Sequence, residues 1–313
     1  MIVVRRPGLL TTIQDLGRAG YAHLGVPLAG AVDVPSLRLA NRLVGNAAGT
    51  AALEITMAGP ELVLEAPTVV ALTGGRVEAS VDGRPLAMNM AQPVPPGGVL
   101  SIGRVTEGVR SYLGVRGGID VEPVLGSRST DTLSGLGPAR LTAGMHLPVG
   151  SSYAGSPPEE HADRPSQHAA GSPLEQVVLP PNVGRETVLR VTLGPRADLF
   201  VPAAADALQE TVWTVTPRSD RTGVRLAGPP LGRRHGRELP SEGLVTGSVQ
   251  VPPDGQPILF LANHPATGGY PVIAVVVSAD VPLAAQARPG SGVRFRVVVS
   301  ALRSSGAPPS PGR

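Results

Sequence analysis

Short apolar runs separated by turns that contain glycine or proline recur along most of the chain. Runs of this length are typical of strands, and their regular spacing favours a closed β-barrel or a sandwich. The predicted strands are residues 2–4, 52–57, 61–64, 69–72, 77–81, 99–102, 111–115, 188–193, 211–215, 258–261, 272–277 and 293–299. The turns predicted in the first half are Gly59-Pro60, Gly74-Gly75, Asp82-Gly83 and Pro96-Gly97-Gly98.

Two stretches carry the start signals of a helix. Asp33 precedes Val34-Pro35, where aspartate caps free N–H groups and proline fits the first turn. Apolar residues follow at helical spacing, and Gly45 ends the run. Asp280-Val281-Pro282 repeats the same start and predicts a short helix through Ala287. The sequence therefore predicts an all-β fold with a few short helices.

The composition of the chain changes near its middle, where the regular spacing of apolar residues is lost and serine, proline and glycine accumulate. Such a stretch is typical of a linker or a mobile loop. We predict an N-terminal β-barrel domain at 1–150, a flexible linker at 151–184, a C-terminal barrel domain at 185–300 and a disordered tail at 301–313. Two short loops that combine Asp, Arg and Gly, one in each half, weakly indicate duplicated halves.

Missing residue types exclude several kinds of chemistry. The 313 residues include no cysteine and no lysine. Without cysteine there is no thiolate nucleophile and no Cys-ligated zinc. Without lysine there is no Schiff base, no P-loop lysine, no biotin attachment site and no Ser–Ser–Lys amidase centre. The chain also lacks a Gly-x-Ser-x-Gly elbow, which disfavours an α/β-hydrolase.

The charge of the chain and the length of its apolar runs indicate which partners and which compartment to expect. The net charge is +3 and all 27 basic residues are arginines, but they form no basic stripe, and aromatic content is only 3%. Both features disfavour nucleic-acid binding. The six histidines show no metal-binding spacing, so no metal is expected. The longest apolar run, 272–277, is too short to span a bilayer, and the N-terminus lacks the order of a signal peptide, so we expect a cytoplasmic protein.

Three polar loops carry side chains suited to a binding site. Residues 262–271 offer an amide, an imidazole, a hydroxyl, paired glycines and a phenol between two apolar runs. Residues 11–21 place Asp15 close to Arg18, and residues 125–131 combine arginine and serines with glycine. Guanidinium groups bind carboxylate or carbonyl oxygens, and glycines let the backbone approach a ligand. Each loop is also open to a purely structural interpretation, as a hairpin turn or a buried polar network.

Together these loops resemble the KipA family, also called allophanate hydrolase subunit 2 or the C subunit of bacterial 5-oxoprolinase. The resemblance runs from about residue 1 to about residue 299. The motifs that carry it are Gly8–Arg18, Leu39–Asn46, Val115–Ile119, Leu125–Thr130, Ser219–Arg221, Gln250–Pro257 and Thr267–Pro271.

The resemblance implies two tandem cyclophilin-like β-barrels and a separate KipI-type partner chain. It implies one of three roles. The first is a subunit of an ATP-dependent 5-oxoprolinase that also contains a LamB/YcsF-type subunit. The second is the carboxyltransferase part of a urea carboxylase-type system, with biotin on another chain. The third is a regulatory partner of a KipI-type kinase inhibitor. No cofactor is expected on this chain itself.

The leading hypothesis is an enzyme subunit that acts on the carbonyl of a small amide or ureido compound. Such a reaction needs donors for a developing oxyanion and a group that moves a proton. The predicted catalytic residues are His264, Asp220 and Thr267. The predicted substrate-binding residues are Arg128, Arg221, Ser219, Gly268, Gly269, Tyr270, Gln250, Asp15 and Arg18.

One position departs from the family pattern. The resemblance leads us to expect aspartate where Asn263 stands, and an amide cannot act as a general base. His264 is then the neighbour suited to proton transfer near neutral pH. We expect these loops to converge on one polar cleft between the two halves.

Overall fold

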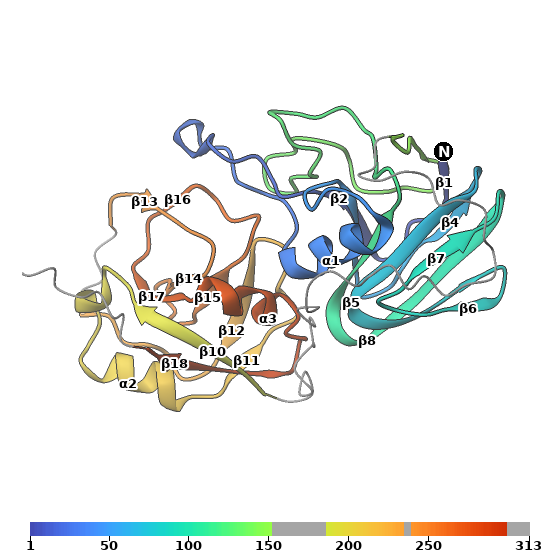
Figure 1. The fold of residues 1–313 in the computed structure, drawn as a ribbon. Helices are drawn as coiled ribbons and strands as arrows, with labels where there is room; N and C mark the ends of the chain where they lie inside the picture. Colours follow the sequence, from blue (N-terminus) through green and yellow to red (C-terminus); the bar gives the residue numbers. More distant parts are fainter. Residues whose placement is uncertain (152–185, 235–238, 299–313) are drawn as a thin grey trace, which may run out of the picture.

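The structure is a computed structural model, and it describes residues 1–151, 186–234 and 239–298. The first and second halves of the chain lie side by side (Figure 1). Nearly all of the predicted linker at 151–184 and the whole predicted tail at 301–313 fall outside the described residues. The domain boundaries therefore stay a prediction.

The first half forms one nine-stranded antiparallel sheet. Its main path is β2-β3-β8-β4-β1-β9, and β5 branches from β8 to pair with β6 and β7. The strands are β1 (Ile2–Arg6), β2 (Leu10–Gln14), β3 (Ala52–Thr56), β4 (Glu61–Leu64), β5 (Thr68–Val81), β6 (Arg84–Leu86), β7 (Ala91–Val94), β8 (Gly98–Val115) and β9 (His146–Leu147).

The predicted turn at Gly74-Gly75 is wrong. This pair lies inside β5, so the two strands predicted on either side of it are one. In the same way the predicted strands 99–102 and 111–115 merge into β8. β5 and β8 pair along their length with register shifts around Arg76 and Val77, and Gly74 has φ of +83°. Irregular pairing at a glycine bends a strand without ending it, which a sequence pattern does not distinguish from a turn.

The second half closes into a seven-stranded barrel, as predicted for this half. The strand order is β10-β17-β14-β15-β12-β11-β18, and parallel pairing of β10 with β18 closes the ring. The barrel strands are β10 (Glu186–Leu193), β11 (Trp213–Val215), β12 (Gly223–Ala227), β14 (Ser248–Gln250), β15 (Ile258–Phe260), β17 (Val272–Val276) and β18 (Gly292–Val297). A separate two-stranded ribbon consists of β13 (Glu242–Gly243) and β16 (Thr267–Gly268).

The all-β prediction with a few short helices is confirmed. The described residues contain α1 (Val34–Val44), α2 (Ala203–Glu210), α3 (Val281–Ala285) and the 3₁₀ turns η1 (Ala22–Leu24), η2 (Ala197–Leu199) and η3 (Ser278–Asp280). The sheet of the first half has no closed strand path among these elements. That both halves are cyclophilin-like barrels therefore stays a prediction. None of the described helices is long and apolar enough to cross a membrane.

Helix α1 begins and ends as predicted. The Asp33 carboxylate accepts a hydrogen bond from Ser36 N at 3.1 Å, and Gly45 ends the helix with φ of +80°. The short helix predicted at Asp280-Val281-Pro282 also forms as α3, although it ends at Ala285 and the Asp280 side chain makes no cap hydrogen bond. Its carboxylate instead accepts from the backbone N and the guanidinium of Arg190 at 2.6 to 2.9 Å. A nearby arginine thus takes the carboxylate that the pattern assigned to the helix end.

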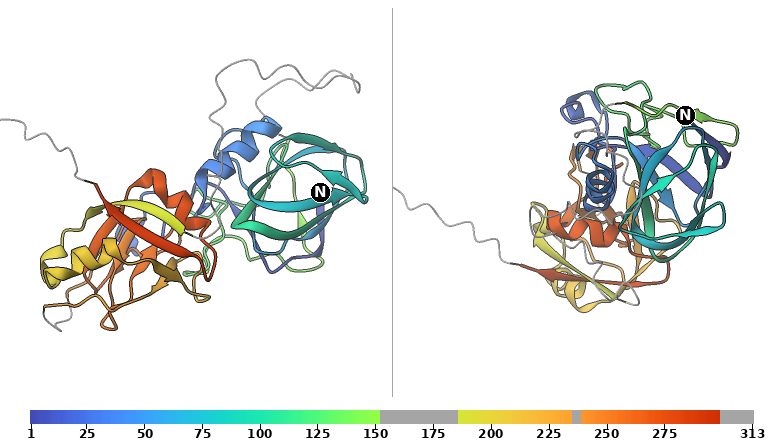
Figure 2. Two further views of the ribbon diagram at one scale, coloured as in Figure 1. Left: turned by 90° about the horizontal axis from the view of Figure 1, so that it is seen from below. Right: turned by 45° about the vertical axis from the view of Figure 1, so that its right-hand side comes forward.

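Each half has its own apolar core, and α1 lies near the junction between them (Figure 2). The helix packs on β5 and β8, where Gly114 allows close approach. A Cβ atom on Gly114 would lie 2.8 Å from the backbone oxygen of Ala40 in α1. Val32, just before α1, is buried in the core of the second half. The segment that leads into α1 therefore ties the first half to the second.

Candidate functional site

Most of the predicted site residues lie on three loops at the upper side of the molecule in Figure 1. These loops are residues 15–33 after β2, 116–145 after β8 and 261–271 between β15 and β17. The first two belong to the first half and the third to the second half. The site is therefore built from loops that meet where the halves meet.

Asp15 binds its own loop to the 125–131 loop. Its Oδ1 accepts hydrogen bonds from Ser127 Oγ at 2.6 Å, Ser129 Oγ at 2.5 Å and Gly17 N at 2.8 Å. Its Oδ2 accepts from Arg128 N at 2.6 Å. Two predicted site residues, Asp15 and Arg128, are thus brought together.

Arg18 points into the interior instead of pairing with Asp15. Its side chain is fully buried, and its guanidinium donates to the backbone oxygens of Ser129 at 2.5 Å and Val124 at 3.4 Å. Its Nη1 lies 4.0 Å from the carboxylate of Asp131. The charge of Arg18 thus acts within the loop cluster and lies close to Asp131.

Asn263 connects the third loop to the first half. Its Nδ2 donates to Asp131 Oδ1 at 2.7 Å, and its Oδ1 accepts from both N and Oγ1 of Thr132 at 2.9 Å. An amide can donate on one side and accept on the other, whereas an aspartate here would set two carboxylates against each other. Burial acts to raise the pKa of Asp131, but hydrogen bonds from Ser134 and Asn263 hold it below its usual value.

His264 lies next to this connection and is 6% exposed. Burial lowers the pKa of its imidazole, which a hydrogen bond to the Pro265 carbonyl offsets only in part. The ring is therefore neutral at pH 7. Its Nδ1 lies 2.7 Å from Pro265 O, and because a carbonyl only accepts, the proton of the neutral ring sits on Nδ1. Nε2 is left as the acceptor, the form that a general base needs.

Gly268, the first of the paired glycines after His264, packs against Gln250. A Cβ atom on Gly268 would lie 2.6 Å from Gln250 Nε2, so a larger residue there would force the Gln250 side chain to move. Gln250 is buried, and its Nε2 donates to the backbone oxygen of Tyr270 at 2.8 Å. Thr267 and Tyr270 are exposed on this loop, next to Gly269. Gln250 thus holds the loop from its buried side, while Thr267 and Tyr270 are exposed to solvent.

Ser219 and Asp220 form the turn between β11 and β12. Asp220 Oδ1 accepts from the backbone N–H groups of Thr222 and Gly223 at 2.8 and 3.1 Å. Ser219 Oγ accepts from Arg225 N at 3.0 Å. Asp220 is exposed, and its backbone oxygen accepts from the guanidinium of Arg110 at 3.1 Å.

Arg221 turns the opposite way and is 2% exposed. Its guanidinium pairs with Glu54 of β3 and donates to Gly30 O at 2.6 Å. Burial acts to raise the pKa of Glu54, but the guanidinium groups of Arg221 and Arg110 outweigh it and keep the carboxylate charged. Tyr112 also donates its hydroxyl to Glu54 at 2.7 Å. Arg221 is therefore a buried link between the halves.

Arg128 lines a small polar hollow of about 270 Å³, which we call the Arg128 hollow. Its guanidinium donates to Val121 O at 2.6 Å and pairs with Asp120 at 2.7 Å. The residues that line the hollow are Asp15, Gly49, Thr50, Ala51, Gly117, Ile119, Asp120, Arg128, Gly150 and Ser151. Neither Asp220 nor His264 is among them.

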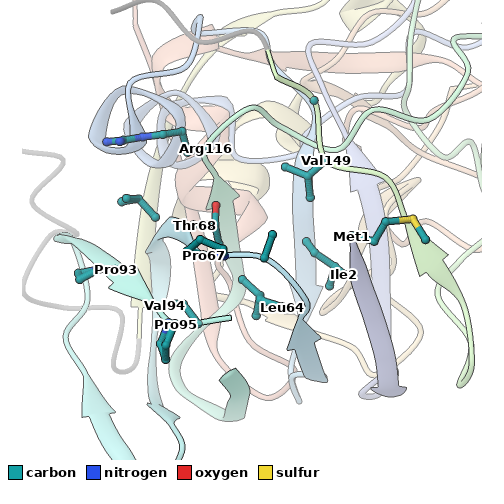
Figure 3. A pocket seen from close by; sticks show the side chains of 13 residues that line it. Met1, Ile2, Leu64, Pro67, Thr68, Pro93, Val94, Pro95, Arg116 and Val149 are labelled. Carbon is teal, nitrogen blue, oxygen red and sulfur yellow. The ribbon is translucent and has the colours of Figure 1, made fainter. Parts of the chain in front are cut away.

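A larger pocket of about 770 Å³ lies in the first half, and its walls are mostly apolar (Figure 3). The predicted site residues are absent from its lining. Arg116 stands at its edge, and its Nε donates to Val44 O at the end of α1, at 3.1 Å. The pocket thus offers few polar groups to orient a substrate, and we place the candidate site at the loops instead.

The structure gathers one part of the predicted set and separates another. Asp15, Arg18 and Arg128 form one cluster, and Asp131 connects it to Asn263 and so to His264. The side chains of Ser219 and Asp220 bond within their own turn, but this turn lies next to the third loop, because Asn263 N donates to Arg221 O at 3.2 Å. Sequence reasoning missed the roles of Arg110 and Gln286. The side-chain amide of Gln286 donates to Asp33 Oδ2 and Arg110 O, and it accepts from the backbone N–H groups of Val109 and Arg110. No local pattern marks either residue. The described residues hold no group of three or more metal-binding side chains.

Comparison with known proteins gives the family. The model of the carboxyltransferase domain, subdomain A and B, matches residues 24–297. The chain belongs to this carboxyltransferase family. This confirms the resemblance that the loop motifs predicted.

The carboxyltransferase relatives differ greatly in length. The chain is 39% identical to the C subunit of 5-oxoprolinase from Escherichia coli, across 94% of this chain and 90% of that protein. It is 35% identical to the urea amidolyase of Saccharomyces cerevisiae but covers only 16% of it. Among solved structures, the Kluyveromyces lactis urea amidolyase matches with a TM-score of 0.81 and 32% identity, over 94% of this chain and 18% of that one. The chain thus spans nearly all of one relative and a small part of the others.

Proposed function

We propose that this chain is a subunit of a multi-chain, ATP-dependent 5-oxoprolinase that opens 5-oxoproline to glutamate. One observation carries the proposal. The 39% identity to the C subunit of the E. coli 5-oxoprolinase extends over 94% of this chain and 90% of that protein, so the two match almost end to end. A KipI-type and a LamB/YcsF-type chain complete the complex in this proposal. This chain has no P-loop, so ATP does not bind to it through that motif.

The loop cluster supports amide chemistry of this kind. Opening a lactam needs a group that moves a proton and donors that stabilise charge on the carbonyl oxygen. In our proposal the neutral His264 moves the proton, and exposed Thr267 with the backbone N–H groups of Gly268 and Gly269 contacts the carbonyl. Asp220 assists from the neighbouring turn, once a partner chain closes the site.

A second function has its own support. The family is named for carboxyl transfer, and urea amidolyase of S. cerevisiae contains a segment 35% identical to this chain. A carboxyltransferase subunit that receives a carboxyl group from biotin on another chain is therefore the alternative. The alternative predicts carboxylation of urea in place of glutamate release.

The test is reconstitution with the partner chains. The chain is co-expressed with KipI-type and LamB/YcsF-type proteins from the same genome, and glutamate release from 5-oxoproline is measured with and without ATP. We expect release that needs ATP and stops when this chain is left out. An unchanged rate without this chain would overturn the proposal, and biotin-dependent consumption of urea would favour the alternative.

The role of His264 is tested in the same complex. His264→Gln removes the basic nitrogen, and we expect turnover to fall about 100-fold or more, in line with the usual contribution of a general base. His146→Gln, at an exposed histidine of β9, is the matched control. Equal turnover in the two variants would remove His264 from the mechanism.

A further inference from the structure

The imidazole of His264 lies against the ring of Phe260. The centroids of the two rings are 6.0 Å apart, and the ring planes make an angle of 52°. Tilted rings attract each other at separations of roughly 4.5 to 7 Å. Both residues are buried, each 6% exposed. Phe260 is the last residue of β15, so the ring that meets the imidazole is fixed to the barrel.

A tight turn brings the two rings together. His264 N donates to Leu261 O at 3.3 Å, which closes a four-residue turn directly after β15. Within this turn, Asn263 N donates to Arg221 O at 3.2 Å, and the Asn263 side chain donates to Asp131 at 2.7 Å. The backbone that carries His264 is therefore held by two neighbouring elements, independently of the ring contact.

The imidazole itself is held less tightly than its backbone. Within the described part of the chain it makes one hydrogen bond, between Nδ1 and Pro265 O at 2.7 Å. One hydrogen bond fixes the position of Nδ1 but lets the ring turn about that atom. The Phe260 ring blocks part of this rotation, because side chains in a protein interior are close-packed. The direction of Nε2 therefore depends on Phe260.

Phe260 also belongs to a small apolar cluster that is separate from the core of the barrel. The buried members of this cluster come from β15, from β17 and from the residue after β13, and they are Phe260, Val272 and Leu244. Burial lowers the pKa of the His264 imidazole, because the charged form loses contact with water. Through its ring contact, Phe260 places this apolar cluster beside the imidazole.

Charged groups surround the His264 loop, but they lie in ion pairs or in water. The loop contacts the 116–145 loop, the turn after β11 and strand β13. Asp220 in that turn is exposed, so water and salt screen its charge. The ion pairs on or next to these elements are Arg18 with Asp131, Glu54 with Arg221, and Arg196 with Glu242. Opposite charges in a close pair largely cancel at a distance, so packing at the ring carries more weight.

We propose that Phe260 is a positioning residue for His264, whose ring fixes the direction of Nε2 and keeps water away from the imidazole. Phe260 acts through His264 and has no contact with the reacting atoms in this proposal. The use of the imidazole in catalysis rests on the proposed function, whereas its orientation and its protonation do not.

Imidazole NMR on the full chain tests the orientation and the protonation. Phe260→Leu removes the ring but keeps an apolar side chain, and the His264 signals are assigned by their loss in His264→Gln. We expect the pKa of His264 to rise in Phe260→Leu toward its ordinary value of about 6.5, because water then reaches the ring. We also expect a mixture of both neutral tautomers, where the wild type keeps its proton on Nδ1.

Phe295→Leu is the matched control. Phe295 of β18 is 1% exposed and lies in the core of the barrel, so this variant has the same chemical change at a buried site away from the cluster. We expect it to keep the pKa and the tautomer of the wild type. Phe260→Met, which also lacks the ring, replaces Phe260→Leu if that variant does not fold. An unchanged pKa and tautomer in the Phe260 variant, or the same change in Phe295→Leu, would overturn the proposal.

Kinetics of the complex separate this proposal from the function. For Phe260→Leu we expect the kcat of glutamate release to fall about fivefold or more with an unchanged KM, because the base is no longer held in place. Activity should also begin to fall at a higher pH on acidification, because His264 is protonated there. If glutamate forms and Phe260→Leu keeps the wild-type kcat and pH profile, the positioning role fails while the function stands. If the imidazole responds as expected but no complex releases glutamate, the function fails while the effect of Phe260 on His264 stands.

Discussion

At the scale of single residues, the contact between Asn263 and Asp131 explains why an amide suits this position. The two residues are 132 positions apart, and their side chains meet at 2.7 Å. The Asn263 side chain carries no charge. It donates a hydrogen bond to Asp131 on one side and accepts hydrogen bonds from Thr132 on the other. The sequence drew attention to Asn263 only as a departure from a family pattern, because a contact so distant in the chain leaves no local signal.

Asn263→Asp should destabilise the fold at neutral pH by about 1–3 kcal/mol, since a carboxylate then faces Asp131 and one hydrogen bond is lost. Repulsion raises the pKa of this pair in the folded state. A raised carboxyl pKa gives stability that is present at low pH and lost as pH rises. The penalty should therefore shrink on acidification from pH 8 to pH 5, as measured by urea unfolding. Asn89→Asp, at an exposed asparagine, is the control and should show no such trend.

His264 should make stability depend on pH in the opposite direction. Its folded-state pKa is lowered by burial, so the unfolded chain binds a proton that the folded chain does not. This contribution is fully present above the ordinary pKa of about 6.5 and is lost as pH falls below it. In urea unfolding between pH 7.5 and pH 5.5, the wild type should lose more stability than His264→Gln. Identical losses in the two proteins would mean that His264 is not buried in solution.

At the scale of elements, the sequence predicts where a helix starts and ends better than whether a strand continues through a glycine. Helix α1 was predicted with its cap at Asp33 and its end at Gly45, because both depend on neighbouring residues only. The joining of strands into β5 and β8 was not predicted, because a glycine in a bent strand and a glycine in a turn look alike. Helix α2 was missed, and the strand predicted from 211 begins only at Trp213.

Packing of α1 on β8 depends on Gly114. A Cβ atom there would lie 2.8 Å from Ala40 O, which is backbone and cannot swing away. Gly114→Ala should therefore cost about 1–3 kcal/mol in urea unfolding, the usual range for overpacking. Gly243→Ala, where a Cβ atom meets nothing within 4 Å, should be nearly neutral. Equal effects would show that the helix does not pack as closely as described.

At the scale of the whole molecule, the two halves are joined by buried charges. Arg221 of the second half pairs with Glu54 of the first, and Arg110 contacts both Glu54 and the oxygen of Asp220. The sequence placed Arg221 at a site because it follows a polar turn. Its inward direction is decided by Glu54, which stands on a strand of the other half, and no pattern around Arg221 reveals that.

Arg221→Met should destabilise the protein by about 3–5 kcal/mol, because it leaves Glu54 buried with one cationic partner removed. The double variant Arg221→Met/Glu54→Gln should lose less than the sum of the two single variants. Arg294→Met breaks an exposed ion pair with Glu186 and should change unfolding little. Strict additivity of the two buried changes would contradict a direct coupling across the junction.

The site could be predicted in part. Asp15 and Arg128 stand in glycine-bearing loops with serines and carboxylates, and the two loops meet in the structure through the backbone N–H of Arg128. Asp220 and His264 are predicted to join them, but the Asp220 side chain bonds within its own turn, which lies next to the 261–271 loop. The sequence names the reactive side chains, whereas their grouping depends on how two halves with separate cores pack against each other.

The measurement that tests the account most directly is ATP-dependent glutamate formation from 5-oxoproline by the purified complex, with this chain present or omitted. The account predicts that glutamate forms only when this chain is present. Formation at the same rate in its absence would contradict it.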